Sequence, residues 1–188
     1  MGQGMAVPAE ARRREGRAKQ GGNTEAFGLS SLNGKPFGRR AFLMDILLRP
    51  WLEADAAACA ALADDEGVAA NLRDVFPHPY TEQDARDFIA LCLAADPEEA
   101  LFCAVAVDGA FAGSVSLTRG ADVARKSAEL GYWFGRPFWG KGVATEAVRQ
   151  MCARGFGEWD IVRIFAEPFS HNCVSCRVLE KNGFTHEG

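Results

Sequence analysis

Trp139-Gly140-Lys141-Gly142-Val143-Ala144-Thr145-Glu146-Ala147 is the stretch of sequence that decides the fold. Its two glycines follow an apolar, aromatic run at residues 130–134 and open a segment whose apolar residues recur at helical spacing. This order predicts a strand, a tight glycine loop and the N-terminus of a helix. Backbone N–H groups converge at such a junction, and the helix dipole adds to their attraction for phosphate. The stretch therefore predicts a site for a phosphorylated ligand.

The glycine loop does not match the common nucleotide motifs. It lacks the G-x-x-x-x-G-K-[ST] pattern of a Walker A loop and the third glycine of a dinucleotide-binding fingerprint. A strand-to-helix turn that binds no ligand is the alternative interpretation. The surroundings favour a ligand, because aromatic residues crowd the loop and the helix begins with the small residues Ala144 and Thr145.

The rest of the chain predicts an α/β fold with a mixed, mostly antiparallel sheet flanked by helices. Strands are expected at residues 46–49, 101–107, 110–118, 127–134 and 161–166, and helices at 53–63, 68–72, 81–95, 143–155 and 172–182. Asp108-Gly109 is a hairpin signal, and Thr81 with Asp84 is an approximate capping box. The strand–helix–strand unit after residue 127 should be parallel.

Composition indicates one acidic domain with a basic extension. Residues 1–40 carry eight Lys and Arg against three Asp and Glu, and residues 41–188 carry thirteen against twenty-two. We expect residues 1–40 to be disordered and residues 41–188 to form the domain. An acidic domain excludes broad nucleic-acid binding and suits a cationic acceptor such as an amine. No apolar run reaches membrane-spanning length, and no secretory signal begins the chain, so no membrane partner is expected.

The six cysteines indicate reduced thiols and a cytoplasmic protein. Most of them lie in apolar segments, where a free cysteine packs as a small hydrophobe. Cys173 and Cys176 form a C-x-x-C pair, but there is no second pair and no nearby pair of histidines. A metal site is therefore not expected.

Three ordered stretches carry a more specific signal. They are Glu129-Leu130-Gly131-Tyr132-Trp133-Phe134, then Phe138 with the glycine loop, then Asn172-x-x-Ser175-x-x-Val178-Leu179-Glu180-Lys181-Asn182-Gly183-Phe184. Over residues 45–188 the chain resembles the GCN5-related N-acetyltransferase (GNAT) family, and within it the branch of ribosomal-protein N-terminal acetyltransferases. Family domains continue past the Gly-Phe pair with further strands, whereas only residues 184–188 follow here. We expect either a truncated sheet or a partner chain that completes it, as in a homodimer.

The resemblance implies acetyl-CoA as co-substrate. Its pyrophosphate would bind backbone N–H groups of the glycine loop, and its pantetheine amides would pair with the backbone near Trp133 and Phe134, where family members separate two strands at a bulge. The residues implied in binding it are Trp133, Phe134, Trp139, Gly140, Lys141, Gly142, Val143, Ala144, Thr145, Asn172 and Ser175.

Acetyl transfer needs a base for the proton of the amine and gains from an acid at the leaving thiolate. Glu129 is the candidate base; a surface carboxylate, with a water chain in its place, is the alternative. Where family members often carry a tyrosine acid, this chain has Leu179, so Ser175 is the candidate acid that the branch suggests. Asn172 would bond the cofactor chain or a water. Helix capping is the alternative role for Asn172 and Ser175.

Phe76, His78 and Tyr80 are expected to line the acceptor site, because residues 76–81 resemble the acceptor-side segment of the branch. The predicted function is transfer of acetyl from acetyl-CoA to a primary amine by direct attack. The amine could belong to a protein N-terminus, a polyamine, an antibiotic or another small molecule. The alternative is a non-catalytic module that binds acyl-CoA or a protein partner.

Overall fold

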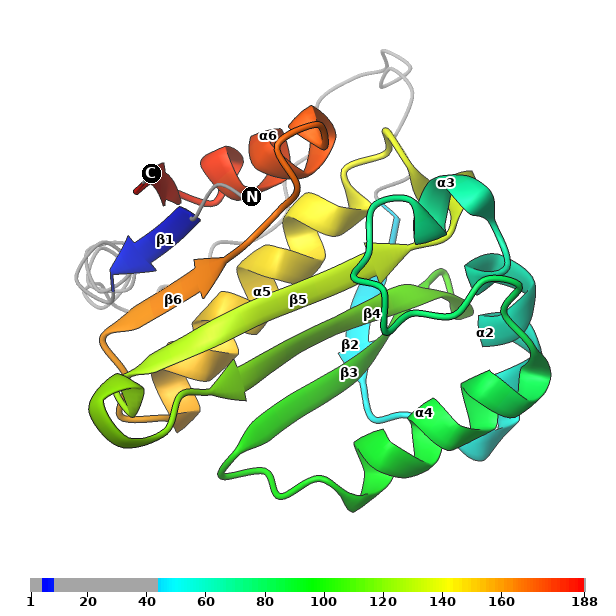
Figure 1. Cartoon of the computed structure of the whole chain (residues 1–188), viewed down its shortest axis with the longest axis horizontal. Coiled ribbons are helices and arrows are strands. Elements are labelled where there is room, and N and C mark those ends of the chain that lie inside the picture. The colour runs from blue at the N-terminus through cyan, green and yellow to red at the C-terminus, as the bar shows by residue number, and fades with distance from the viewer. Residues whose placement is uncertain (1–4, 9–43, 188) are drawn as a thin grey trace, which may run out of the picture.

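A computed structural model describes residues 5–8 and 44–187 of the chain. Within these ranges seven strands form one sheet in the order β2-β3-β4-β5-β6-β1-β7 (Figure 1). They are β1 (Met5–Pro8), β2 (Ile46–Arg49), β3 (Ala100–Val107), β4 (Ala110–Arg119), β5 (Ser127–Phe134), β6 (Arg163–Ala166) and β7 (Thr185–His186). Neighbouring strands are antiparallel except β5 and β6, which are parallel. The mixed, mostly antiparallel sheet predicted from the sequence is confirmed.

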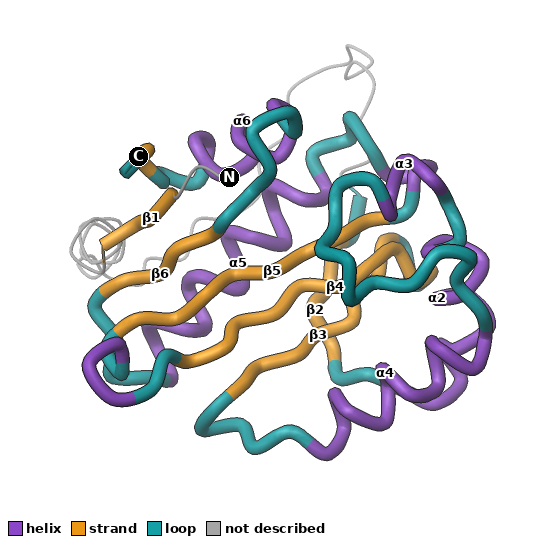
Figure 2. The backbone as a smooth tube through the Cα atoms, viewed as in Figure 1, coloured by secondary structure: helices purple, strands orange, loops and turns teal. Residues whose placement is uncertain are grey.

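Helices cover both faces of this sheet (Figure 2). The described residues form α2 (Ala56–Ala63), α3 (Glu66–Ala69), α4 (Glu82–Ala94), α5 (Val143–Glu158) and α6 (Cys173–Lys181), with short 3-10 turns η2 (Glu53–Asp55), η3 (Asp122–Ala124) and η4 (Arg136–Phe138). Side chains of β5 alternate between the faces, as a strand requires. Leu130 and Phe134 pack in the core beneath α5 and α6, and Trp133 packs on the opposite face with residues of α2 and α4. None of the described helices is long and apolar enough to cross a membrane.

Local signals placed most element ends correctly. Thr81 and Asp84 form the predicted capping box at the start of α4, and Asp108 and Gly109 both adopt positive φ in the predicted hairpin. Helix α3 begins at Glu66, two residues before the predicted start, because the Asp65 side chain accepts hydrogen bonds from the first-turn N–H groups. Helix α5 continues past Gly155, where a Cβ would lie only 2.4 Å from Leu117, so glycine allows close contact with the sheet.

The prediction for residues 1–40 is wrong for residues 5–8 and otherwise concerns residues outside the described ranges. Residues 5–8 form β1, which pairs antiparallel with β6 on one side and with β7 on the other. The Met5 side chain is fully buried in the main core. We expected this edge of the sheet to be truncated or to be completed by a partner chain. Instead, β1 from the N-terminal segment of the same chain lies between β6 and β7.

Replacing Met5 with alanine should lower the free energy of unfolding by about 2–5 kcal/mol, because a fully buried methionine is truncated and leaves a cavity. Urea unfolding of the full chain measures the change. Val123→Ala is the matched control, since Val123 is 89% exposed. Equal unfolding midpoints for the two variants would show that β1 is not packed in the core.

Candidate active site

The glycine loop adopts a conformation that few residues other than glycine accept. Gly140 has φ 71° and Gly142 has φ 82°, and a Cβ on either would point into open space. Gly142 is the N-cap residue of α5 and contributes no side-chain bond to the helix. The first helical bond runs from Glu146 N to Gly142 O, so the N–H groups of Val143, Ala144 and Thr145 have no acceptor within the helix. The loop therefore presents open backbone donors, as phosphate binding requires.

Aromatic and ionic contacts hold the glycine loop against α3. The indole Nε1 of Trp139 donates to Phe134 O at 2.6 Å, and the Arg136 guanidinium lies over the Trp139 ring at 5.2 Å. Arg136 also donates from Nε and Nη2 to the carboxylate of Asp65, at 2.8 and 2.6 Å. Since Asp65 caps α3 as well, one carboxylate connects that helix with the segment that leads into the glycine loop.

This ion pair predicts a pH dependence at the acidic end. The Arg136 guanidinium, helped by backbone N–H donors of α3, holds the pKa of Asp65 at about 2. A carboxyl whose folded pKa is depressed stabilises the fold above its unfolded pKa of about 3.9, and the stabilisation is lost as the pH falls toward 2. Asp65→Asn should therefore flatten the fall of melting temperature between pH 4 and pH 2. Arg136→Gln should flatten it similarly; a fall as steep as in the wild type would contradict the assignment.

Strands β5 and β6 separate beside the loop. Their pairing is confined to residues 127–129 of β5 and 163–165 of β6. The bonds from Gly135 N to Ala112 O and from Gly120 N to Ser127 O show that odd-numbered residues of β5 bond to β4. The even-numbered residues of β5, which include Tyr132 and Phe134, therefore direct their backbone N–H and C=O groups away from β4. Tyr132 and Phe134 direct them into the gap that opens between β5 and β6.

The gap differs in two respects from the prediction. Trp133 pairs with Ser114 of β4, so Tyr132 and not Trp133 accompanies Phe134 at the gap. No bulge interrupts β5, which keeps a continuous register with β4; the irregularity lies between β3 and β4, at Val105 and Ala106. The strands separate simply because β6 ends at Ala166 while β5 continues to Phe134.

Helix α6 brings the predicted polar residues beside this gap. Asn172 is its N-cap residue, and its Oδ1 accepts from Ser175 N at 3.0 Å, so the capping role is present. The Ser175 hydroxyl lies 2.6 Å from the Tyr132 hydroxyl. Leu179 is fully buried. At the other end, the buried Asn182 donates to Thr145 O in the first turn of α5, which ties the two helices together.

Glu129 lies on the sheet face that carries Trp133, where β5 and β6 are last paired. Its side chain is 34% exposed and forms an ion pair with Arg73, which follows α3 in the sequence. Arg73 Nη2 also lies 3.4 Å from Glu167 Oε2, just beyond the end of β6. Two carboxylates therefore share one guanidinium at the point where the strands separate.

The predicted acceptor residues lie on the same face but have different accessibility. Phe76 stacks on Tyr80, with ring centroids 4.8 Å apart, and meets the edge of Trp133 at 6.1 Å. Tyr80 is only 6% exposed, and its ring packs against that of Phe76, which leaves Phe76 the more accessible of the two. The His78 imidazole is accessible and lies 3.5 Å from Asp64.

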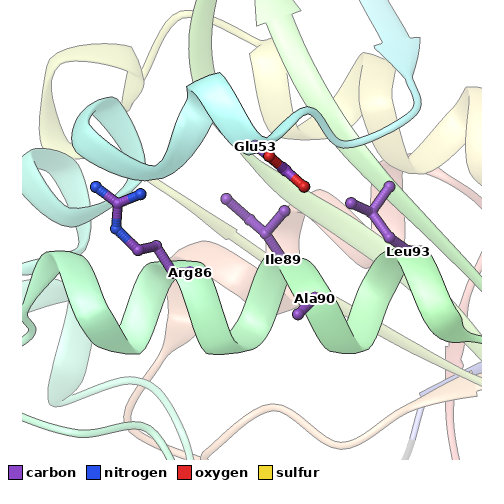
Figure 3. Close-up of a pocket in the computed structure, with 5 residues that line it drawn as sticks. All are labelled: Glu53, Arg86, Ile89, Ala90 and Leu93. Carbon is purple, nitrogen blue, oxygen red and sulfur yellow. The ribbon is translucent and has the colours of Figure 1, made fainter.

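A separate shallow pocket lies between η2 and α4 (Figure 3). Its lining is Glu53, Arg86, Ile89, Ala90 and Leu93, none of which is a predicted site residue. Among the residues described, no group of His, Cys, Asp and Glu is arranged to hold a metal ion. All six cysteines lie in the described ranges, and none of them forms a disulfide.

Sequence reasoning missed the residues that act through distant contacts. Asn182 and Tyr132 lie in a helix and a strand that the sequence predicts, whereas Arg73 and Arg136 lie between predicted elements. Each of the four has a partner at least 37 residues away along the chain. Of these residues, only Tyr132 could have been found from the sequence. Side chains alternate along the strand, so Tyr132 lies on the face of the sheet opposite Trp133, which is the face that α6 covers.

Comparison with known proteins identifies the family. The acetyltransferase (GNAT) domain matches residues 45–185. The putative ribosomal N-acetyltransferase YdaF of Bacillus subtilis is 36% identical over 81 residues, which span 43% of this chain but only 44% of that relative.

Two solved structures share the fold. RimJ of Mycobacterium smegmatis in complex with CoA-disulfide has a TM-score of 0.67 at 25% identity, covering 76% of this chain and 71% of that one. The microcin C7 self-immunity acetyltransferase MccE, in complex with acetyl-CoA and AMP, has a TM-score of 0.66 at 26% identity, covering 76% and 80%. Since the family match extends over most of the residues that build the sheet and the glycine loop, the chain belongs to the GNAT family of acetyltransferase domains.

Proposed function

We propose that the chain is an N-acetyltransferase that moves the acetyl group of acetyl-CoA to a primary amine. The observation that carries this proposal is that two binding features adjoin each other. The N-terminus of α5 behind Gly140 and Gly142 suits a pyrophosphate, and the edge of β5 at Tyr132, which no described strand pairs with, suits the amides of an extended chain. The solved complex of MccE with acetyl-CoA supports the choice of ligand.

The residues around the gap suit direct attack by the amine. Glu129 would accept the proton that the amine loses as its nitrogen bonds to the acetyl carbon. Arg73 contacts Oε1 of this carboxylate, so Oε2 is the oxygen that would take the proton. As the carbon–sulfur bond breaks, Ser175 would donate a hydrogen bond to the leaving thiolate. No covalent acetyl-enzyme is needed.

The acceptor is proposed to arrive as an ammonium ion and to lose one proton to solvent before its neutral nitrogen attacks; Glu129 takes the second proton. Residues 41–188 carry a net charge of −9, and Glu129 and Glu167 lie together beside the gap. A protein N-terminus is one candidate, since YdaF is named a ribosomal N-acetyltransferase; a small amine is the other. Cysteines that form no disulfide suit the cytoplasm.

Release of CoA thiol in the presence of an amine panel tests the proposal. The panel should include peptides with free N-termini, a polyamine and an aminoglycoside, with acetyl-CoA hydrolysis in the absence of amine as background. Turnover above background on any member supports the enzyme. Tight binding of CoA without turnover on every amine would instead favour the non-catalytic acyl-CoA-binding module.

A further inference from the structure

Two hydroxyl groups meet between β5 and α6. The phenol oxygen of Tyr132 lies 2.6 Å from Ser175 Oγ and 3.3 Å from Ser175 O, which makes the hydroxyl pair the closer contact. The ring packs against the main core and lies beside the Phe134 ring, with centroids 6.3 Å apart. The phenol therefore approaches Ser175 from a fixed direction.

The surroundings indicate which hydroxyl donates. The Ser175 carbonyl lies within α6, where the N–H four residues later is its regular partner, so it competes weakly for the phenol proton. Burial raises the pKa of Tyr132 to about 12, so the phenol keeps its proton at neutral pH. A phenol that donates to Ser175 Oγ leaves the serine proton available for another acceptor.

We propose that Tyr132 is a positioning residue for acetyl transfer: its phenol donates to Ser175 Oγ and so directs the serine proton toward the gap where the leaving sulfur would lie. This inference rests on the proposed function, in which Ser175 serves the thiolate. Tyr132 forms no bond to the reacting atoms. Its effect is exerted only through the orientation and polarisation of the serine hydroxyl.

Kinetics of single and double variants on the best amine of the panel test the inference. Tyr132→Phe should lower kcat about tenfold, the effect of losing one oriented hydrogen bond, while the KM for acetyl-CoA changes less than twofold. Ser175→Ala should lower kcat further. In the Ser175→Ala background, Tyr132→Phe should then have no additional effect, because the phenol has lost the group it orients. In a Ser175→Thr background, which keeps a hydroxyl, Tyr132→Phe should again lower kcat by most of the factor seen in the wild type.

A matched control removes a buried hydroxyl elsewhere in the sheet. Ser114→Ala deletes the Oγ that donates to Cys103 O at 3.4 Å and should leave kcat unchanged. The inference is overturned if the factors by which the two single substitutions lower kcat multiply in the double variant. It is also overturned if Tyr132→Phe changes KM and the melting temperature but leaves kcat intact, because that result would show a purely structural role. If the wild type is active and the Tyr132→Phe variant is equally active, the inference about Tyr132 is overturned but the proposed function is not. Absence of turnover by the wild type on every amine would overturn the proposed function together with it.

Discussion

Replacing Gly142 with valine should weaken CoA binding at least about 100-fold. Gly142 has φ 82°, a conformation in which a residue with a Cβ costs about 1–2 kcal/mol, and more if that Cβ is branched. The added side chain would also enter the open space in front of the first-turn N–H groups of α5. Each charge-assisted bond lost there is worth about 1.5–3 kcal/mol, so two lost bonds account for the expected change.

Gly157→Val is the matched control for this substitution. Gly157 lies in the same helix, a Cβ there also meets open space, and its backbone does not require glycine. Calorimetric titration with CoA should show the loss only for Gly142→Val, and thermal unfolding should show that both variants remain folded. Wild-type affinity in Gly142→Val would mean that the pyrophosphate does not bind at this loop.

What the sequence predicted well depends on signals a few residues long. The hairpin at Asp108 needs only two residues that tolerate positive φ, and the capping box at Thr81 needs one carboxylate three residues later. Strand β5 spans residues 127–134 in the prediction and in the structure, because its pattern and its neighbouring turns are both local. The signals for these features therefore lie within short segments, although the packed fold supplies most of their stability.

What the sequence could not predict depends on pairing across the fold. Strand β1 has four residues, and its partners in β6 lie 155–161 positions away, so nothing near Met5 marks it as a strand. The ion pair between Arg73 and Glu129 joins a loop to a strand 56 residues later. The conformation of the glycine loop was therefore predicted from neighbouring residues, whereas the contacts among side chains from separate elements were not.

The proposed role of Glu129 as the base predicts the second large effect. Glu129→Gln keeps the size of the side chain but cannot accept the amine proton, and loss of a general base lowers rates by about 10²–10⁴. We expect kcat to fall by a factor in this range while the affinity for CoA is unchanged, since Glu129 lies on the face opposite α5 and α6. Steady-state kinetics and CoA titration on the same preparations separate the two quantities.

Glu167→Gln distinguishes a base from a mere partner of Arg73. Both carboxylates bind the same guanidinium, so both variants remove one ion pair from Arg73, but only Glu129 lies on β5 where the strands separate. A large loss of kcat confined to Glu129→Gln supports the base, because the ionic environment of Arg73 changes in both variants. Equal, small losses of kcat in the two variants would show that both carboxylates only bind Arg73 or attract the cationic acceptor. A chain of water molecules would then have to remove the amine proton.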